Sequence, residues 1–227
     1  MGTGNKQKNA AVIVAHPDDE TLWCGGTILS NQSYNWFIIS LCRGNDPDRA
    51  PKFFNCLKIL NAHGAMGLLD DGPEQYPLNK NVVKSALLEL LPSTLFDLVI
   101  THNPSGEYTR HLRHEEVSQA VIELWYQDEI SIKELWMFAY EDGNKSYLPR
   151  AANKAIQYKL PTPIWKQKYK IITETYGFSP GGFEAETTPR VEAFWKFHRA
   201  EDAFSWLQQG GKLKPTSIRK NENIGTL

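Results

Sequence analysis

The stretch Val12-Ile-Val-Ala-His16-Pro-Asp18-Asp19-Glu20-Thr-Leu decides how the rest of the chain is interpreted. A β-branched apolar run stops at a histidine, and a proline with three consecutive acidic residues follows before a helical pattern. This order predicts a buried strand that delivers an imidazole and several carboxylates to its C-terminal end. In open α/β sheets, ligands bind at that edge, where the strand order reverses. Imidazole and carboxylate in one tight turn suit a divalent transition metal.

An ordinary helix start explains the same residues. Pro17 suits a first helical position, and Asp18, Asp19 and Glu20 favour the positive end of the helix dipole. Taken alone, the stretch leaves the capping and the metal-site interpretations open. The choice between them depends on residues much later in the chain.

The composition indicates one sizeable α/β domain with no charged partner surface. The 227 residues include 25 basic and 26 acidic ones, and the net charge of -1 gives no electrostatic footprint for nucleic acid or an anionic membrane. The start lacks the apolar run of a signal peptide, and no stretch reaches the ~18–20 apolar residues of a membrane span. Cys24, Cys42 and Cys56 lie in apolar stretches and are expected to be reduced core thiols. We therefore expect a cytoplasmic protein, and the composition leaves a homo-oligomer open.

Strand-like and helix-like patterns alternate along residues 10–140. Apolar runs predict strands at 10–15, 36–42, 67–69, 96–101 and 135–140, and amphipathic patterns predict helices at 20–30, 51–62, 80–91 and 113–126. The alternation favours a parallel sheet covered on both faces. Residues 141–227 are expected to form a C-terminal extension, with an edge strand at 157–160 and helices at 164–176 and 189–208. A Gly-x-Gly-x-x-Gly motif is absent after the first strand, which argues against a dinucleotide site.

A second informative stretch covers residues 106–117 and contains His111-x-x-His114. Histidines three apart at a helix start lie on one face. The preceding strand ends at His102, so this loop should share the carboxyl edge with His16. A histidine pair alone is weak support for a metal site. Together with His16 and Asp19, it predicts two histidines and a carboxylate with coordination positions left open, which is typical of a catalytic site. We do not count His102 as a ligand.

The Ala-His-Pro-Asp-Asp-Glu segment at 15–20, together with His111-x-x-His114, resembles the PIG-L/LmbE-like family of zinc-dependent N-acetylglucosaminyl de-N-acetylases. The resemblance covers residues 10–140, and two matching motifs at a sensible distance argue against coincidence. It implies a three-layer α/β/α sandwich with a Rossmann-like, mostly parallel sheet. Residues 1–227 would then form a single deacetylase-like domain whose core, residues 10–140, carries the metal site.

The same resemblance implies a role for each motif residue. His16, Asp19 and His114 would bind zinc, Asp18 would be the general base, and His111 would stabilise the tetrahedral oxyanion. These roles are chemically sensible, because a zinc-bound water loses its proton near neutral pH and Asp18 is adjacent in sequence to a ligand. Two histidines and one carboxylate also suit iron(II). We therefore expect Zn²⁺, with Fe²⁺ as the alternative.

Three further residues are candidates for substrate binding. Arg43 ends the second strand at a place that resembles the family's substrate-contacting loop, and Arg49 matches a second basic position there. Arg43 could bind a substrate hydroxyl or phosphate, or it could pair with Asp46 or Asp48. Tyr108 resembles a tyrosine that precedes the histidine pair, although its spacing from the pair departs from that of some members.

The resulting hypothesis is a metal-dependent hydrolase that removes an N-acetyl or other short N-acyl group from an amino-sugar conjugate. That small molecule would be its partner, and no nucleic acid is expected. A deacetylase of a thiol-glycoside pathway, of the mycothiol or bacillithiol kind, would differ only in substrate. A tailoring enzyme for an antibiotic or a lipid-linked glycan is also open. The alternative of a different class is a non-catalytic carbohydrate-binding protein on the same fold.

Overall fold

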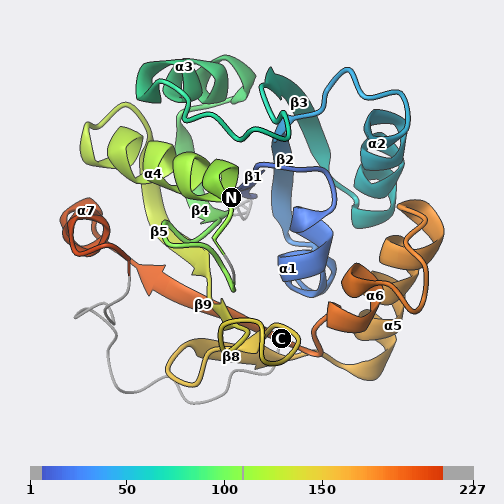
Figure 1. Ribbon diagram of the computed structural model, residues 1–227. Helices are drawn as coiled ribbons and strands as arrows, with labels where there is room; N and C mark the ends of the chain where they lie inside the picture. Colours follow the sequence, from blue (N-terminus) through green and yellow to red (C-terminus); the bar gives the residue numbers. More distant parts are fainter. Residues whose placement is uncertain (1–6, 109, 212–227) are drawn as a thin grey trace, which may run out of the picture.

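The computed structural model describes residues 7–108 and 110–211. Its centre is a seven-stranded sheet with the strand order β3-β2-β1-β4-β5-β9-β8 (Figure 1). These strands are β1 (Lys8–Val14), β2 (Tyr34–Cys42), β3 (His63–Leu69), β4 (Leu95–Thr101), β5 (Ser131–Phe138), β8 (Ile156–Lys159) and β9 (Val191–Phe197). A separate two-stranded ribbon pairs β6 (Tyr140–Glu141) with β7 (Arg150–Ala151).

The path of the chain through the sheet reverses its direction beside β1. Strands β1 to β5 run parallel, whereas β9 pairs antiparallel with β5 and β8 pairs antiparallel with β9. The chain moves outward from β1 through β2 to β3, and then returns to place β4 on the other side of β1. In such sheets, ligands bind outside the carboxyl ends of the strands where the order reverses. His16 follows β1 and His102 follows β4, so both lie at this switch point.

Helices cover both faces of the sheet (Figure 1). Consecutive residues of β1 enter different buried clusters, with Val12 in the first and Ile13 in the second, as expected for a strand buried on both sides. The first cluster is completed by α1 (Asp19–Ser30), α2 (Arg49–Leu60) and the π-helical turn η1 (Ile171–Thr175), and the second by α3 (Lys80–Leu90), α4 (Leu112–Tyr126) and α7 (Ala200–Gln208). This confirms the predicted three-layer α/β/α sandwich.

The strands and helices predicted between residues 10 and 140 are present with shifted ends. β3 begins at His63 instead of residue 67, and β5 covers Ser131–Phe138 instead of 135–140. Beyond residue 140, the predicted edge strand is β8, and the helix predicted at 164–176 is α5 (Thr162–Lys170) continued by η1. A short helix, α6 (Phe183–Thr187), follows the turn-rich segment after η1.

The prediction of one amphipathic helix at 189–208 is wrong. The first half is β9, which pairs antiparallel with β5 and β8, and only Ala200–Gln208 is helical. Phe194 and Phe197 are completely buried in β9. Their spacing of three residues also fits a helix, but aromatic residues pack well on a pleated sheet, and the open edge of β5 selects the strand.

A buried carboxylate attaches the C-terminal extension to α1. Glu192 of β9 accepts hydrogen bonds from the backbone N–H groups of Gly26 and Thr27 at 2.8 and 2.7 Å. Its carboxylate also forms a fully buried ion pair with Lys168 of α5, at 2.6 Å. A Cβ atom at residue 26 would overlap the side chain of Leu160, which explains the glycine inside α1.

Cys24, Cys42 and Cys56 are buried and free of disulfides, as predicted. Among the residues that the structure describes, no helix has both the length and the apolar character to cross a bilayer. The sheet continues through β9 and β8 into the C-terminal extension. A single domain over residues 1–227 stays a prediction.

Candidate active site

Three side chains predicted to bind a metal meet at the carboxyl end of β1. His16 Nδ1 lies 3.0 Å from His114 Nε2, and Asp19 Oδ2 lies 3.3 Å from each of these nitrogens. His16 follows β1, Asp19 is the first residue of α1, and His114 lies in the first turn of α4. The ligands of a tetrahedral ion with bonds of ~2.0–2.2 Å stand roughly 3.3–3.6 Å apart. Both Asp19 distances match this spacing and the distance between the two histidine nitrogens is slightly shorter, so the donor types and their arrangement fit a zinc-like cation.

The electrostatic balance of this cluster favours a positive charge at its centre. Burial opposes ionisation of Asp19, but the charge of His114 and hydrogen bonds with His114 and His16 outweigh it and hold the pKa of Asp19 well below its usual value. Burial likewise opposes protonation of His114, yet Asp19 and Glu107 raise its pKa well above the ordinary range. A divalent cation bound between these groups would supply such a positive charge directly.

Two more imidazoles border the cluster. A ring nitrogen of His111 lies within 4.8 Å of ring nitrogens of His16 and His114. A ring nitrogen of His102 lies within the same distance of an Asp19 carboxylate oxygen and a His114 nitrogen. His102 Nε2 already accepts a hydrogen bond of 2.9 Å from the backbone N–H of Ala15. Its lone pair is therefore engaged, and the absence of His102 from the ligand set stays a prediction.

Asp18 lies beside the cluster in an unusual backbone conformation. Its φ of 120° falls in the region that residues other than glycine rarely adopt. The Glu20 carboxylate accepts a hydrogen bond of 3.0 Å from the Asp18 N–H, and Arg49 Nη1 donates one of 3.0 Å to Asp18 Oδ2. Burial, followed by the charges of Asp19 and Glu20, raises the pKa of Asp18 well above its usual value, while His16 and Arg49 act in the opposite direction. Asp18 is thus held in place and made more basic than an exposed aspartate.

His111 immediately precedes α4, and its ring stacks on His114 with a centroid distance of 4.4 Å. Its Nδ1 is buried and has no hydrogen-bond partner among the described residues. Burial, followed by the nearby His114 and His16, lowers the pKa of His111 to about 4. At neutral pH the ring is therefore uncharged and can donate one N–H hydrogen bond.

Tyr108 forms an aromatic wall on the other side of the cluster. Its ring lies 5.2 Å from that of Trp23 and 5.7 Å from that of Phe183, which is the first residue of α6 and 40% exposed. Burial, followed by the charge of Asp19, raises the pKa of Tyr108, so its hydroxyl stays protonated. Tyr108 and Phe183 line a cavity of about 250 Å³ together with the three predicted ligand residues, Asp18 and His111.

Both arginines predicted to bind substrate reach this cavity, and each is paired with a carboxylate. Arg43 donates from Nε and Nη2 to Asp71 Oδ2 at 3.1 and 2.8 Å, while 43% of its side chain remains exposed. It lies 3.6 Å from Asp46 as well, so the pairing foreseen with that residue is also present. The carboxylate partner of Arg49 is Asp18, which accepts a hydrogen bond from its guanidinium.

Four further polar or aromatic residues line or support the cavity. Asp71 accepts a hydrogen bond from His16 Nε2 at 3.0 Å, and Glu107 contacts both His102 and His114. Asp71 follows the carboxyl end of β3, and Glu107 follows that of β4. This position after a strand is the one sequence signal that marks them as site residues. Phe183 and Glu184 come from the C-terminal extension, where no motif points to the site.

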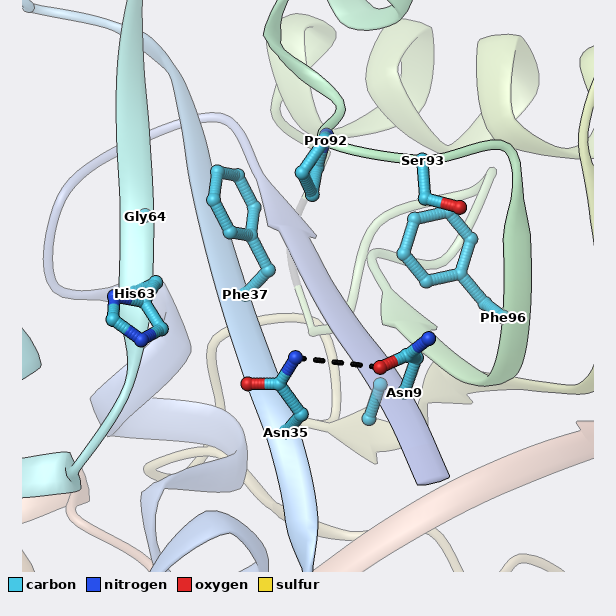
Figure 2. A pocket seen from close by; sticks show the side chains of 9 residues that line it. Asn9, Asn35, Phe37, His63, Gly64, Pro92, Ser93 and Phe96 are labelled. Atoms are coloured by element: carbon cyan, nitrogen blue, oxygen red, sulfur yellow. Dashed lines mark hydrogen bonds between the residues drawn. The ribbon is translucent and has the colours of Figure 1, made fainter. Parts of the chain in front are cut away.

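A second cavity, of about 550 Å³, lies at the opposite edge of the sheet (Figure 2). It is lined by residues near the amino ends of the strands, including Asn9 of β1, Asn35 of β2 and His63 of β3. Asn35 donates a hydrogen bond of 3.3 Å to Asn9. The described residues that line this cavity include no carboxylate, so it offers neither the ligand set nor the base found at the other edge.

Known proteins resemble this chain at the level of a family, a sequence and the fold. The family model described as PIG-L, GlcNAc-PI de-N-acetylase, matches residues 11–125. An uncharacterized protein of Acanthamoeba polyphaga mimivirus is 25% identical over 188 residues, which cover 74% of this chain and 80% of the viral protein. The N,N'-diacetylchitobiose deacetylase of Pyrococcus horikoshii has a similar structure, with a TM-score of 0.63 and 16% identity over 85% of each chain.

The same fold also carries other chemistry. The 4-carboxy-2-hydroxymuconate hydratase of Pseudomonas putida matches with a TM-score of 0.55 and 14% identity, over 96% of this chain and 100% of its own. At these identities, the likeness to solved structures shows the fold alone. On one fold, the reaction depends on the residues of the site.

Proposed function

Because the chain belongs to the PIG-L family of de-N-acetylases, whose model matches residues 11–125, we propose that it is a metal-dependent N-deacetylase. Its substrate would be an amino-sugar conjugate that carries an N-acetyl or other short N-acyl group. The observation that carries the proposal is the meeting of His16, Asp19 and His114 beside Asp18, at the switch point of the sheet.

The metal would be held by His16 Nδ1, Asp19 Oδ2 and His114 Nε2. Two imidazoles and one carboxylate suit Zn²⁺ and also Fe²⁺, and the three ligands leave positions open for water and substrate. When bound, such an ion polarises a carbonyl oxygen and lowers the pKa of a bound water. This ligand set is thus a catalytic rather than a structural one.

Asp18 would act as the general base and then as the general acid. Its carboxylate accepts a proton from the attacking water as the water oxygen bonds to the amide carbon. The same proton passes to the nitrogen as the carbon–nitrogen bond breaks, which leaves acetate and a free amine. The raised pKa of Asp18 supports both steps, because a base works best when its pKa approaches the working pH.

His111 and Tyr108 would stabilise the negative charge that develops on the carbonyl oxygen. Both line the cavity, and both are hydrogen-bond donors at neutral pH, one through an imidazole N–H and the other through a phenol. A fixed donor at this position typically contributes ~10²–10³ in rate. Because both groups are neutral, they add no positive charge beside a bound cation.

The exposed part of Arg43 and the wall made by Tyr108 and Phe183 would contact the sugar. Arg49 would act on the substrate through Asp18, which it holds. A deacetylase of a thiol-glycoside pathway fits the same site, and only its substrate distinguishes it. A non-catalytic carbohydrate-binding protein is less well supported, because the side chains that a hydrolase would need lie together at one site.

An acetate-release assay tests this proposal. The protein, loaded with Zn²⁺ or Fe²⁺, is incubated with a panel of N-acetylated amino-sugar conjugates, and acetate and free amine are measured together. We expect equal amounts of both products, and their loss after chelation. Sugar binding that persists after chelation, with no acetate from any conjugate, would instead indicate a binding protein.

A further inference from the structure

Glu107 is a buried carboxylate between two histidines at the base of the site. It lies in the loop between β4 and α4 and is only 1% exposed. One carboxylate oxygen, Oε1, contacts His102 Nδ1, and the other, Oε2, lies 2.8 Å from His114 Nδ1. A buried carboxylate is costly unless hydrogen bonds satisfy it. Here each of its two oxygens has an imidazole as partner.

The partners of His102 determine its tautomer. Its Nε2 accepts a hydrogen bond from the backbone N–H of Ala15, at 2.9 Å, and therefore carries no proton. The proton of a neutral ring must then be on Nδ1, which donates to Glu107. The backbone carbonyl of His102 also accepts a hydrogen bond of 2.7 Å from the Ser118 hydroxyl of α4. His102 is thus a fixed anchor at the end of β4.

Glu107 passes this constraint on to His114. When His114 Nδ1 donates to Glu107, the lone pair of a neutral ring is on Nε2, the nitrogen that faces His16 and Asp19. The rings of His102 and His114 are stacked, with centroids 3.9 Å apart and planes 16° from parallel, so one carboxylate can reach both Nδ1 atoms. The opposite tautomer of His114 would present an N–H to the metal and could not bind it.

We propose that Glu107 is a positioning residue that fixes the tautomer and orientation of His114 for metal binding, with His102 as its anchor. The inference rests on the proposed function, because it assumes that His114 is a ligand. Carboxylate partners of this kind orient ligand histidines and raise their basicity, and their removal typically weakens metal binding about 10–100-fold.

The test replaces Glu107 by glutamine in the full chain. The amide side chain would offer one acceptor oxygen where two N–H donors point, so one histidine must lose its partner or change tautomer. We expect the affinity for Zn²⁺, measured by competition with a chromophoric chelator, to fall about 10–100-fold in Glu107→Gln. In Glu107→Asp the charge is kept but the reach is shorter, so the affinity should recover part of this loss.

Glu115→Gln is the matched control. Glu115 is adjacent to His114 and 5% exposed, but its partner is Arg110 and not a histidine. The control removes a carboxylate charge next to the same ligand, and its Zn²⁺ affinity should stay within about twofold of the wild-type value.

A second readout concerns the apoprotein and separates positioning from general stability. Nitrogen-15 NMR of labelled histidines reports the tautomer of each ring at neutral pH. The wild-type apoprotein should show His102 as the Nδ1–H tautomer and His114 with a proton on Nδ1, and Glu107→Gln should change the protonation of at least one of these nitrogens.

The outcomes distinguish this inference from the proposed function. If the wild-type protein binds no metal, the proposed function fails first. If the wild-type protein binds Zn²⁺ and Glu107→Gln binds it equally well with unchanged tautomers, the proposed function stands and the role of Glu107 is refuted. If Glu107→Gln does not fold, the affinity and tautomers of Glu107→Asp decide the question by the same criteria.

Discussion

The guanidinium of Arg49 donates a hydrogen bond of 3.0 Å to Oδ2 of Asp18 and lies 4.7 Å above the ring of Phe178. Arg49 is the first residue of α2, whose start is fixed by the Asp46 carboxylate, which accepts the backbone N–H groups of Asp48 and Arg49. The candidate base is thus attached to a second helix as well as to its own turn. This contact has consequences for the pH dependence of the reaction.

Arg49→Gln should move the acidic limb of the pH profile upward. Burial and the charges of Asp19 and Glu20 raise the pKa of Asp18, and Arg49 opposes them. Removing the positive charge of Arg49 leaves His16 as the remaining opposing charge, so Asp18 ionises only at higher pH. We expect the limb of kcat/KM to shift upward by about one pH unit, with activity partly restored at alkaline pH. Arg199→Gln, an exposed arginine paired with Glu201, is the control, and an unmoved limb in Arg49→Gln contradicts the pairing.

Asp18→Asn should separate turnover from metal binding. The amide is isosteric with the carboxylate but cannot accept the proton of the attacking water. We expect kcat to fall about 10²–10⁴-fold with no loss of bound metal. Turnover and metal content are measured on the same preparation. Full activity in this variant would show that another group is the base.

Phe183→Ala should weaken substrate binding alone. Phe183 lines the cavity, is 40% exposed and packs on Tyr108. Among the described residues, its ring makes no aromatic contact with the histidines that would bind the metal. We expect KM to rise about tenfold, equivalent to ~1.4 kcal/mol, with kcat and metal content preserved. Phe54→Ala serves for comparison, because Phe54 is 44% exposed on α2 and does not line the cavity. Equal KM values in the two variants would exclude Phe183 from the substrate site.

Lys168→Met should destabilise the fold without touching the site. The substitution leaves the Glu192 carboxylate buried with no opposite charge, although Gly26 and Thr27 still donate to it. Breaking one side of a buried ion pair typically costs about 3–5 kcal/mol. Urea unfolding measures the loss. Lys166→Met, at an exposed position of the same helix, should change the unfolding free energy by less than about 1 kcal/mol, and an equal effect of both variants would rule out this role for the pair.

The sequence predicted the core of the fold well because local and tertiary preferences agree there. Residues 10–15 are apolar on both faces, and β1 is indeed buried on both faces by two layers of helices. Local and tertiary preferences disagree in β9. The spacing of its aromatic residues also suits a helix, and pairing with the open edge of β5 makes the segment a strand. β3 was predicted too short because its first half, His63-Gly-Ala-Met, lacks a β-branched run.

The residues with motif signals were predicted, and the residues that support them were not. Three site residues stand out in the sequence because each lies at the end of a predicted strand or at the start of a predicted helix. They are His16, Asp19 and His114. Asp71 carries no local signal of its contact with His16, since this hydrogen bond joins residues 55 positions apart. The contact of Arg49 with Asp18 is likewise a tertiary one. Local patterns contain no information about such pairs.

Metal analysis of the purified protein tests the central claim most directly. Wild-type protein and His16→Ala are saturated with Zn²⁺, desalted and analysed by mass spectrometry of the metal, with His63→Ala as a control because His63 is exposed at the far edge of the sheet. We predict about one ion per chain in the wild type and in His63→Ala, and almost none in His16→Ala. A wild-type protein without bound metal, or a His16→Ala variant that keeps the full amount, would contradict the account.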